Sequence, residues 1–429
     1  MFYCYFHASA FSMLIAALQQ HQSLTSLRIV ACRLDCNKVR VLVHLLKDFA
    51  HLRELCLDQN NIKDDGAVAL SNCLAVVREL EVISLKQNLL TSRGVITLVR
   101  SLLQHTANTL LYLGDVGVND NEAHNVFRAL DQDGAFDRVQ IVYHADGIPQ
   151  LIRVVQANRY RIEEIGFGKL SLGHQYVHEL LSALSNNCSV KRLTLEGTLV
   201  DDRLAQELYP FLSANKTLKY LAVGKVDRLS SLILLCQGLA ENTSISRLRI
   251  GSCDRFGSDS TRAFAAMLKA NKTLNELSIW AYDVERIRPG LSENYTLTEL
   301  SLGWPYNENA LYVAEVFCRN YRTLNKAVKF VSMKSSDRSL ALAFEKVRYS
   351  DSLLRQLRKY SGHSEAEVKT SVKRASRYIL DDFPVLSGIV REKLECHRND
   401  LNMTQIDQLC ADCLAKLFSY VNLEDVIQA

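Results

Sequence analysis

Two motifs in the chain have part of the spacing of a metal site. His174 and His178 stand one helical turn apart, which can place two imidazoles on one zinc ion. The zinc-protease motif needs a glutamate after its first histidine, where this chain has Gln175. In the stretch 131–134 (DQDG), the glycine arrives two residues too early for a calcium loop. We interpret the histidines as surface residues of a helix and the second stretch as a turn.

The stretch 166–169 (GFGK) has the composition of a phosphate-binding loop. Such a loop needs a glycine five residues before its Gly-Lys pair and a hydroxyl residue after it, where the chain has Glu163 and Leu170. The sequence contains no other nucleotide-binding motif. We therefore expect no nucleotide switch.

Near the C-terminus, Cys396, His397, Cys410 and Cys413 could supply four metal ligands. The last two cysteines also belong to an apolar stripe at helical spacing, a pattern more typical of a packed helix than of a metal site. We therefore predict core cysteines. The stripe consists of Ile406, Leu409, Cys410, Cys413, Leu414 and Leu417.

Part of this stripe has the spacing of a known docking motif. Leu409, Cys413 and Leu417, each four residues apart, resemble the elongin-binding box of ubiquitin-ligase substrate receptors. Gln408 stands where that box has a small residue, and no proline-containing cullin box follows. The resemblance implies elongin as a partner and a substrate-recognition adaptor as the function. The alternative, which we favour, is that Leu417 is buried in a cap on the preceding repeats.

Composition narrows the function classes. The chain has 429 residues and a net charge of +4, too small to indicate nucleic acid or a membrane surface. No stretch approaches the ~18 apolar residues of a membrane span. Twelve cysteines are scattered along the chain and several fall at apolar positions, which favours reduced thiols. We expect a cytoplasmic protein without cofactor or metal.

One repeated element must position these residues. Its pattern is written three times in residues 24–90, with starts 28 residues apart at Leu24, Leu52 and Leu80. Apolar residues at alternate positions predict a strand with one edge in the core. Asn60 and Asn88 occupy the same offset in two units, where an amide can bond backbone groups of a turn.

The pattern continues along the chain. Amphipathic helical stretches, such as 205–212 and 263–268, lie between the strands. About 12 repeats of about 28 residues result, which predicts an α/β solenoid in the form of a right-handed horseshoe. Further strands are predicted to start near residues 108, 136, 162, 190, 218, 245, 274 and 297, with a degraded one at 324–331.

The period and the full helices resemble the ribonuclease-inhibitor class of leucine-rich repeats. This class forms the repeat arm of NLR-type proteins and the body of Ran-type GTPase-activating proteins. The resemblance covers roughly residues 11–345 and implies a fold more than a function. It makes a Ran-type GTPase-activating protein an alternative function, although no segment matches the catalytic loops of that family.

We divide the chain into a truncated first repeat helix at 1–23, a solenoid at 24–345 and a C-terminal helical segment at 346–429. The first segment lacks the positive start of a signal peptide. The last could be a cap or a small interaction domain. It opens with a basic stretch, 346–377, which we interpret as a solvated helical face; the alternative is a surface that binds an acidic partner or phospholipids.

Three helices are expected in the last segment. Ser364 and Glu367 form a capping box that should open a helix to about Leu380. Further helices are predicted at 384–396 and 404–420.

Four asparagines match the glycosylation sequon and recur between a helix and the next strand. We interpret them as helix-ending turns in which asparagine adopts the left-handed conformation. They are Asn215, Asn242, Asn271 and Asn294.

On each strand, the residues between the buried apolar positions should face the concave side of the horseshoe. These positions contain no nucleophile with a base, but they do contain Tyr and Arg, and Tyr143, Trp280 and Trp304 lie just beyond the strands. Tyr, Trp and Arg are the residue types that dominate protein-interface hot spots. The sequence therefore predicts a non-enzymatic scaffold that binds a protein partner there. The predicted partner-binding residues are Tyr112, Arg138, Tyr143, Arg192, Tyr220, Arg247, Arg249, Glu276, Trp280, Glu299 and Trp304.

Overall fold

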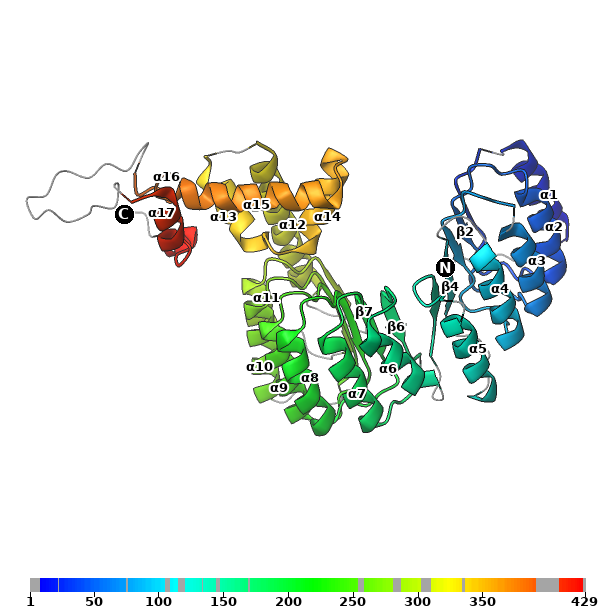
Figure 1. The fold of residues 1–429 in the computed structure, drawn as a ribbon. Coiled ribbons are helices and arrows are strands. Elements are labelled where there is room, and N and C mark those ends of the chain that lie inside the picture. The colour runs from blue at the N-terminus through cyan, green and yellow to red at the C-terminus, as the bar shows by residue number, and fades with distance from the viewer. Residues whose placement is uncertain are drawn as a thin grey trace, which may run out of the picture. The chain divides into compact units, whose positions relative to one another are not determined.

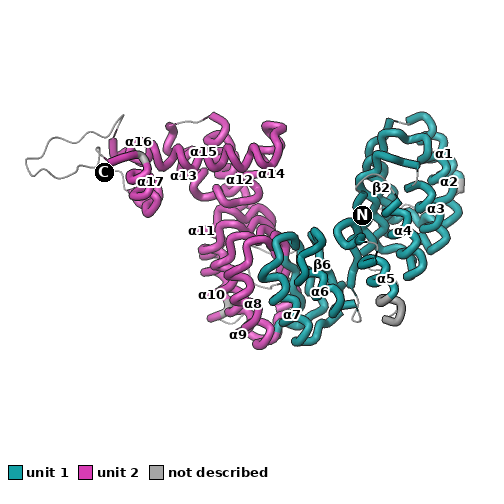
Figure 2. The backbone as a smooth tube through the Cα atoms, viewed as in Figure 1, with its two compact units in different colours: residues 1–200, 221–225 teal, residues 201–220, 226–429 magenta. Residues whose placement is uncertain are grey.

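The computed structural model forms two compact units, residues 1–200 with 221–225 and residues 201–220 with 226–429 (Figures 1 and 2). Within them, the structure describes residues 8–21, 23–74, 76–104, 109–114, 120–132, 134–143, 147–168, 170–253, 258–280, 287–301, 310–333, 336–390 and 409–426.

The first unit alternates short parallel strands with helices. Its helices are α1 (Ala8–Gln20), α2 (Cys36–Leu46), α3 (Asp64–Leu74), α4 (Ser92–Gln104), α5 (Asp120–Gln132), α6 (Ile148–Ala157) and α7 (His174–Ser185). Its strands are β1 (Ser26–Arg28), β2 (Glu54–Cys56), β3 (Val82–Ser84), β4 (Leu110–Gly114), β5 (Val139–Ile141), β6 (Glu164–Gly166) and β7 (Arg192–Leu195). The first five form one sheet in chain order, and β6 pairs with β7.

The register follows the repeat. Ser26 pairs with Glu54, and Glu54 pairs with Val82, so each residue lies beside its equivalent in the next repeat. The middle residues Leu55 and Ile83 are fully buried. The predicted alternation of core and surface positions is confirmed.

The second unit continues the alternation and then becomes helical. It contains α8 (Asp202–Ala214), α9 (Leu229–Glu241), α10 (Ser258–Ala270) and α11 (Arg288–Glu293). Its parallel strands are β9 (Arg247–Ser252), β10 (Glu276–Trp280) and β11 (Glu299–Ser301). Tyr220 at the start of β8 (Tyr220–Val223) also belongs to this unit.

The C-terminal helices have a core of their own, built from apolar residues such as Phe330, Phe344 and Phe383. The predicted capping box is confirmed, because the Ser364 and Glu367 side chains each bond the backbone amide of the other. The elements are α12 (Ala310–Met333), α13 (Arg338–Val347), α14 (Asp351–Ser361), α15 (Glu365–Asp381), α16 (Phe383–Leu386), α17 (Ala411–Phe418) and a 3-10 helix, η4 (Leu423–Asp425).

Three predictions for these helices need correction. The degraded strand at 324–331 is wrong, because these residues lie inside α12, with Leu324, Ala327 and Val328 buried at helical spacing. The helix predicted from 384 ends at Leu386, and residues 391–396 lie outside the described residues. Within the described residues, the helix predicted at 404–420 begins at Ala411 and ends at Phe418, where Ser419 caps it, and residues 404–408 lie outside the described residues.

The four sequon asparagines are structural, but not for the predicted reason. Asn215, Asn242 and Asn294 end their helices with φ between −68° and −89°, which is not the left-handed region. Their side chains are buried and bonded instead. The Asn242 amide donates to the Leu212 carbonyl at 2.7 Å and accepts from the Ile245 amide, also at 2.7 Å.

The buried asparagines that bond the backbone of neighbouring repeats form a series, which we call the asparagine ladder. The ladder continues into the C-terminal helices. The Asn294 amide donates to the Leu268 carbonyl, and Asn320 of α12 donates to the Leu297 carbonyl, both at 2.7 Å. Arg319 also donates to the Leu291 carbonyl at 2.9 Å. Helix α12 therefore satisfies the carbonyl groups that a further repeat would have covered.

In the described part of the chain, no helix is long and apolar enough to cross a bilayer.

Candidate functional site

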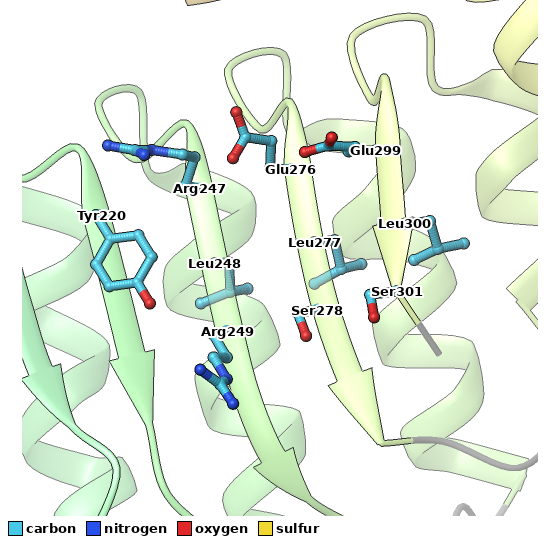
Figure 3. Close-up of a pocket in the computed structure, with 10 residues that line it drawn as sticks. All are labelled: Tyr220, Arg247, Leu248, Arg249, Glu276, Leu277, Ser278, Glu299, Leu300 and Ser301. Carbon is cyan, nitrogen blue, oxygen red and sulfur yellow. The ribbon is translucent and has the colours of Figure 1, made fainter. Parts of the chain in front are cut away.

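The strand face of the second unit is hollowed beside Tyr220 and over β9, β10 and β11 (Figure 3). The hollow has a volume of about 400 Å³. The helices of the second unit lie behind the sheet, so the hollow is on the face of the sheet that no helix covers in this view. The lining residues are Tyr220, Arg247, Leu248, Arg249, Glu276, Leu277, Ser278, Glu299, Leu300 and Ser301.

One side of the hollow is basic and aromatic. The Arg247 guanidinium lies over the Tyr220 ring, with its central carbon 5.4 Å from the ring centroid. Such a cation–π contact holds both side chains in place before a ligand arrives. Arg249, two residues further along β9, is exposed. Residues of these types form interface hot spots because they bring large area at modest entropic cost.

The other side of the hollow is acidic. The strand register places Glu276 of β10 directly beside Glu299 of β11 and beside Arg247 of β9. A guanidinium from a distant helix reaches this point, since Arg355 of α14 lies 3.1 Å from the Glu276 carboxylate. Glu299 is exposed and, among the described residues, has no ion-pair partner.

A second hollow, of about 250 Å³, continues the first toward the C-terminal helices. Glu276 and Glu299 line both hollows, and Tyr321, Arg355 and Lys359 line the second. The face is therefore bounded at this end by α12 and α14, both of which carry cationic or aromatic groups toward it.

One buried asparagine positions α14 against the strands. Asn275, fully buried just before β10, donates to the Ser350 hydroxyl at 2.8 Å and accepts from the Ser352 amide at 3.1 Å. Ser350 and Ser352 form the N-terminal cap and first turn of α14. Because this turn is fixed, Arg355 lies one turn further on, where it meets Glu276.

The structure brings five of the predicted binding residues together in this hollow and distributes others elsewhere. The five are Tyr220, Arg247, Arg249, Glu276 and Glu299. Trp280 is the last residue of β10, and Trp304 lies outside the described residues.

Three predicted residues lie half-buried in the first unit. Burial raises the pKa of Tyr112 above its usual range, and the nearby Glu164 carboxylate acts in the same direction. Arg192 lies 3.4 Å from that carboxylate. Burial lowers the pKa of Arg138, whose side chain donates to the Thr109 carbonyl.

Tyr143 is not a surface residue, so its prediction as a binding residue is wrong. It is 1% exposed, and its ring packs 5.3 Å from Phe127 and 6.2 Å from Phe167, measured between centroids. Burial accordingly raises its pKa far above the usual range. Val139, Ile141 and Tyr143 continue one alternation, and this signal could have identified the tyrosine as core.

The prediction of core cysteines at the C-terminus is also wrong. Cys410 and Cys413 are exposed, and Leu417 is 44% exposed. The residues that pack α17 into the helical core are Phe418 and the partly buried Leu414, which is the one described member of the predicted stripe found there. Cys396 and His397 lie outside the described residues.

The remaining motifs have structural positions. His174 and His178 lie on α7, and no group of three or more potential metal ligands occurs among the described residues. Gly166 ends β6, with Phe167 buried behind it, and the stretch 131–134 lies where α5 ends.

Sequence reasoning missed Arg355 and Asn275 as residues of the site. Arg355 had been assigned only to the basic stretch 346–377. Neither residue stands at a repeat position that faces the open side, and their contacts join segments more than 70 residues apart.

No protein-family model matches the chain. Porcine ribonuclease inhibitor is 26% identical over 265 residues, which are 60% of this chain and 58% of that protein. Rat capping protein, Arp2/3 and myosin-I linker protein 3 is 24% identical over 80% of this chain and 26% of its own length. Human NACHT, LRR and PYD domains-containing protein 12 is 26% identical over 46% of this chain and 22% of its own length.

The chain thus spans between about a fifth and three-fifths of the relatives it matches. Their similarity agrees with the strand, turn and helix seen in each repeat. The fold is an α/β leucine-rich repeat solenoid with C-terminal helices, and the chain is similar to leucine-rich repeat proteins of the ribonuclease-inhibitor class.

Proposed function

We propose that this chain is a non-enzymatic, cytoplasmic scaffold that binds a protein partner on the strand face of its second unit. The observation that carries the proposal is the hollow over β9 to β11, in which the stacked Tyr220 and Arg247 face Glu276 and Glu299. Both charged and apolar residues line the hollow, and a second hollow beside it extends the surface. Such a surface suits the rim and anchors of a protein interface.

Two further features support the proposal. The names of two relatives describe proteins that act on other proteins, as a ribonuclease inhibitor and as a linker of capping protein, Arp2/3 and myosin-I. The cysteines that the structure describes are free thiols, and several are buried at repeat positions, which suits a reducing compartment.

A proximity-labelling comparison in cells tests the proposal. The test variant replaces Tyr220 and Arg247 with alanine and so removes the stacked pair. The matched control is Arg203→Ala, which removes an exposed arginine from α8 on the helix side. We expect the test variant to lose a defined set of labelled proteins that the control retains, with both variants melting like the parent. Identical labelling by all three proteins would refute the proposed binding face.

A further inference from the structure

The charges of the hollow form two rows that cross the strands, and this arrangement restricts which partner can bind. The inference rests on the proposed function and specifies the partner's chemistry. The first row lies near the start of the strands and consists of Arg247, Glu276 and Glu299. The second row lies two residues further along and consists of Arg249, Ser278 and Ser301. Figure 3 shows both rows on the open face.

The acidic half of the first row is suited to a basic side chain. Neighbouring strands lie about 4.8 Å apart, so Glu276 and Glu299 are like charges directly side by side, an arrangement that is unfavourable unless a cation lies between them. Arg355 shows which kind of group the pair accepts, because its guanidinium already lies 3.1 Å from Glu276. Glu299 is exposed and lines both hollows, so its carboxylate can receive a second cation.

The second row is suited to a carboxylate. Arg249 supplies an exposed guanidinium, and Ser278 and Ser301 follow it in register on β10 and β11. Both serines line the hollow. A guanidinium with two hydroxyl donors is a common means of binding an acidic group.

The separation of the rows matches the repeat of an extended peptide. Two residues along a strand span about 6.6 Å, and side chains on one side of an extended peptide recur at the same distance. We propose that the partner presents an extended segment with a basic and an acidic residue two positions apart, the basic one on Glu276 and Glu299, the acidic one on Arg249, Ser278 and Ser301. The basic residue comes first in a segment that runs parallel to the strands, and the acidic residue comes first in a segment that runs antiparallel to them.

A displayed library of random heptapeptides, selected on the full chain, tests this inference. We expect the selected peptides to be enriched in opposite charges at a spacing of two, relative to spacings of one and three. A synthetic peptide from this pool should bind Glu299→Gln about tenfold more weakly than the parent, as measured by fluorescence anisotropy. The matched control Glu315→Gln removes an exposed carboxylate of α12 and should leave affinity unchanged.

A charge swap separates recognition from a general effect of the substitution. Glu299→Lys should reject the selected peptide and should bind a version in which glutamate replaces its basic residue. Selected peptides without the spacing, yet dependent on Tyr220 and Arg247, would overturn the inference and leave the proposed function standing. If no peptide depends on the strand face, the inference also fails, and the labelling comparison decides the proposed function separately.

Discussion

At the scale of single residues, the repeated asparagines do more for the fold than their sequon pattern suggests. Asn242 and Asn271 are each 2% exposed, and each bonds backbone groups of its own turn and of the preceding repeat. The four bonds of such an amide satisfy groups that the turn cannot pair itself. Each buried polar group left unpaired lowers the free energy of unfolding by about 1–3 kcal/mol, so removal of this amide should destabilise the fold.

Asn242→Ala should therefore lower the free energy of unfolding of the second unit by about 2–4 kcal/mol. The substitution leaves the Leu212 carbonyl and the Ile245 amide without their partner. Urea unfolding with hydrogen exchange resolved to α8–α10 measures the change. Asn37→Ala, at an exposed position of α2, is the control and should change little. Equal shifts for the two variants would contradict the structural role of the ladder.

At the scale of elements, the C-terminal helix α17 shows how a pattern can indicate a helix and still misplace its buried face. The predicted stripe includes Cys413 and Leu417, which are exposed, whereas Phe418 is buried in the core and Leu414 packs against it. The Phe418 ring stacks on Phe383, with centroids 4.8 Å apart and planes 16° apart. Leu417 lies next to it on the exposed side.

Phe418→Ala should loosen the C-terminal core by about 3–5 kcal/mol, the usual cost of truncating a buried aromatic residue. Leu417→Ala is the matched substitution on the same turn and should cost much less, because the Leu417 side chain is already 44% exposed. Hydrogen exchange across α15 and α17 measures both. A larger effect for Leu417 would show that the originally predicted stripe, and not this one, faces the core.

Helix α12 illustrates a second error at this scale. The segment 324–331 was expected to continue the repeat interval as a strand. Its buried residues Leu324, Ala327 and Val328 instead recur at helical spacing, and Asn320 at its side continues the ladder. Periodicity of 3.6 residues was present in the sequence, but the expectation of one more repeat outweighed it.

At the scale of the molecule, the second unit joins repeats and helices into one body through Asn275. This side chain pairs with Thr296, Ser350 and Ser352, and so links β10, the following repeat and α14. Arg355 depends on the same turn of α14 for its position beside Glu276. A change in the position of α14 should therefore also change the position of Arg355 at the proposed binding face.

Asn275→Ala should speed amide exchange at the first turn of α14 and at the start of β10 by at least about tenfold, the effect expected from losing buried bonds worth 1–3 kcal/mol. Strands β1–β5 in the first unit should exchange as before. Asn275→Asp keeps an acceptor for the Ser352 amide and should have a smaller effect. Uniform acceleration throughout the chain would argue against a local link and for general destabilisation.

The amino-acid sequence was enough to predict the strand positions up to residue 301, the repeat interval, the capping box of Ser364 and Glu367, and five residues of the candidate site. These follow from alternation and short-range bonding, which neighbouring residues express locally. Only the tertiary structure decided that Arg355 reaches Glu276, 79 residues away, and that Ser350 reaches Asn275, 75 residues away. It also decided that the Leu417 side chain lies on the exposed side of α17. Such contacts depend on how whole elements pack, and no local pattern encodes that packing.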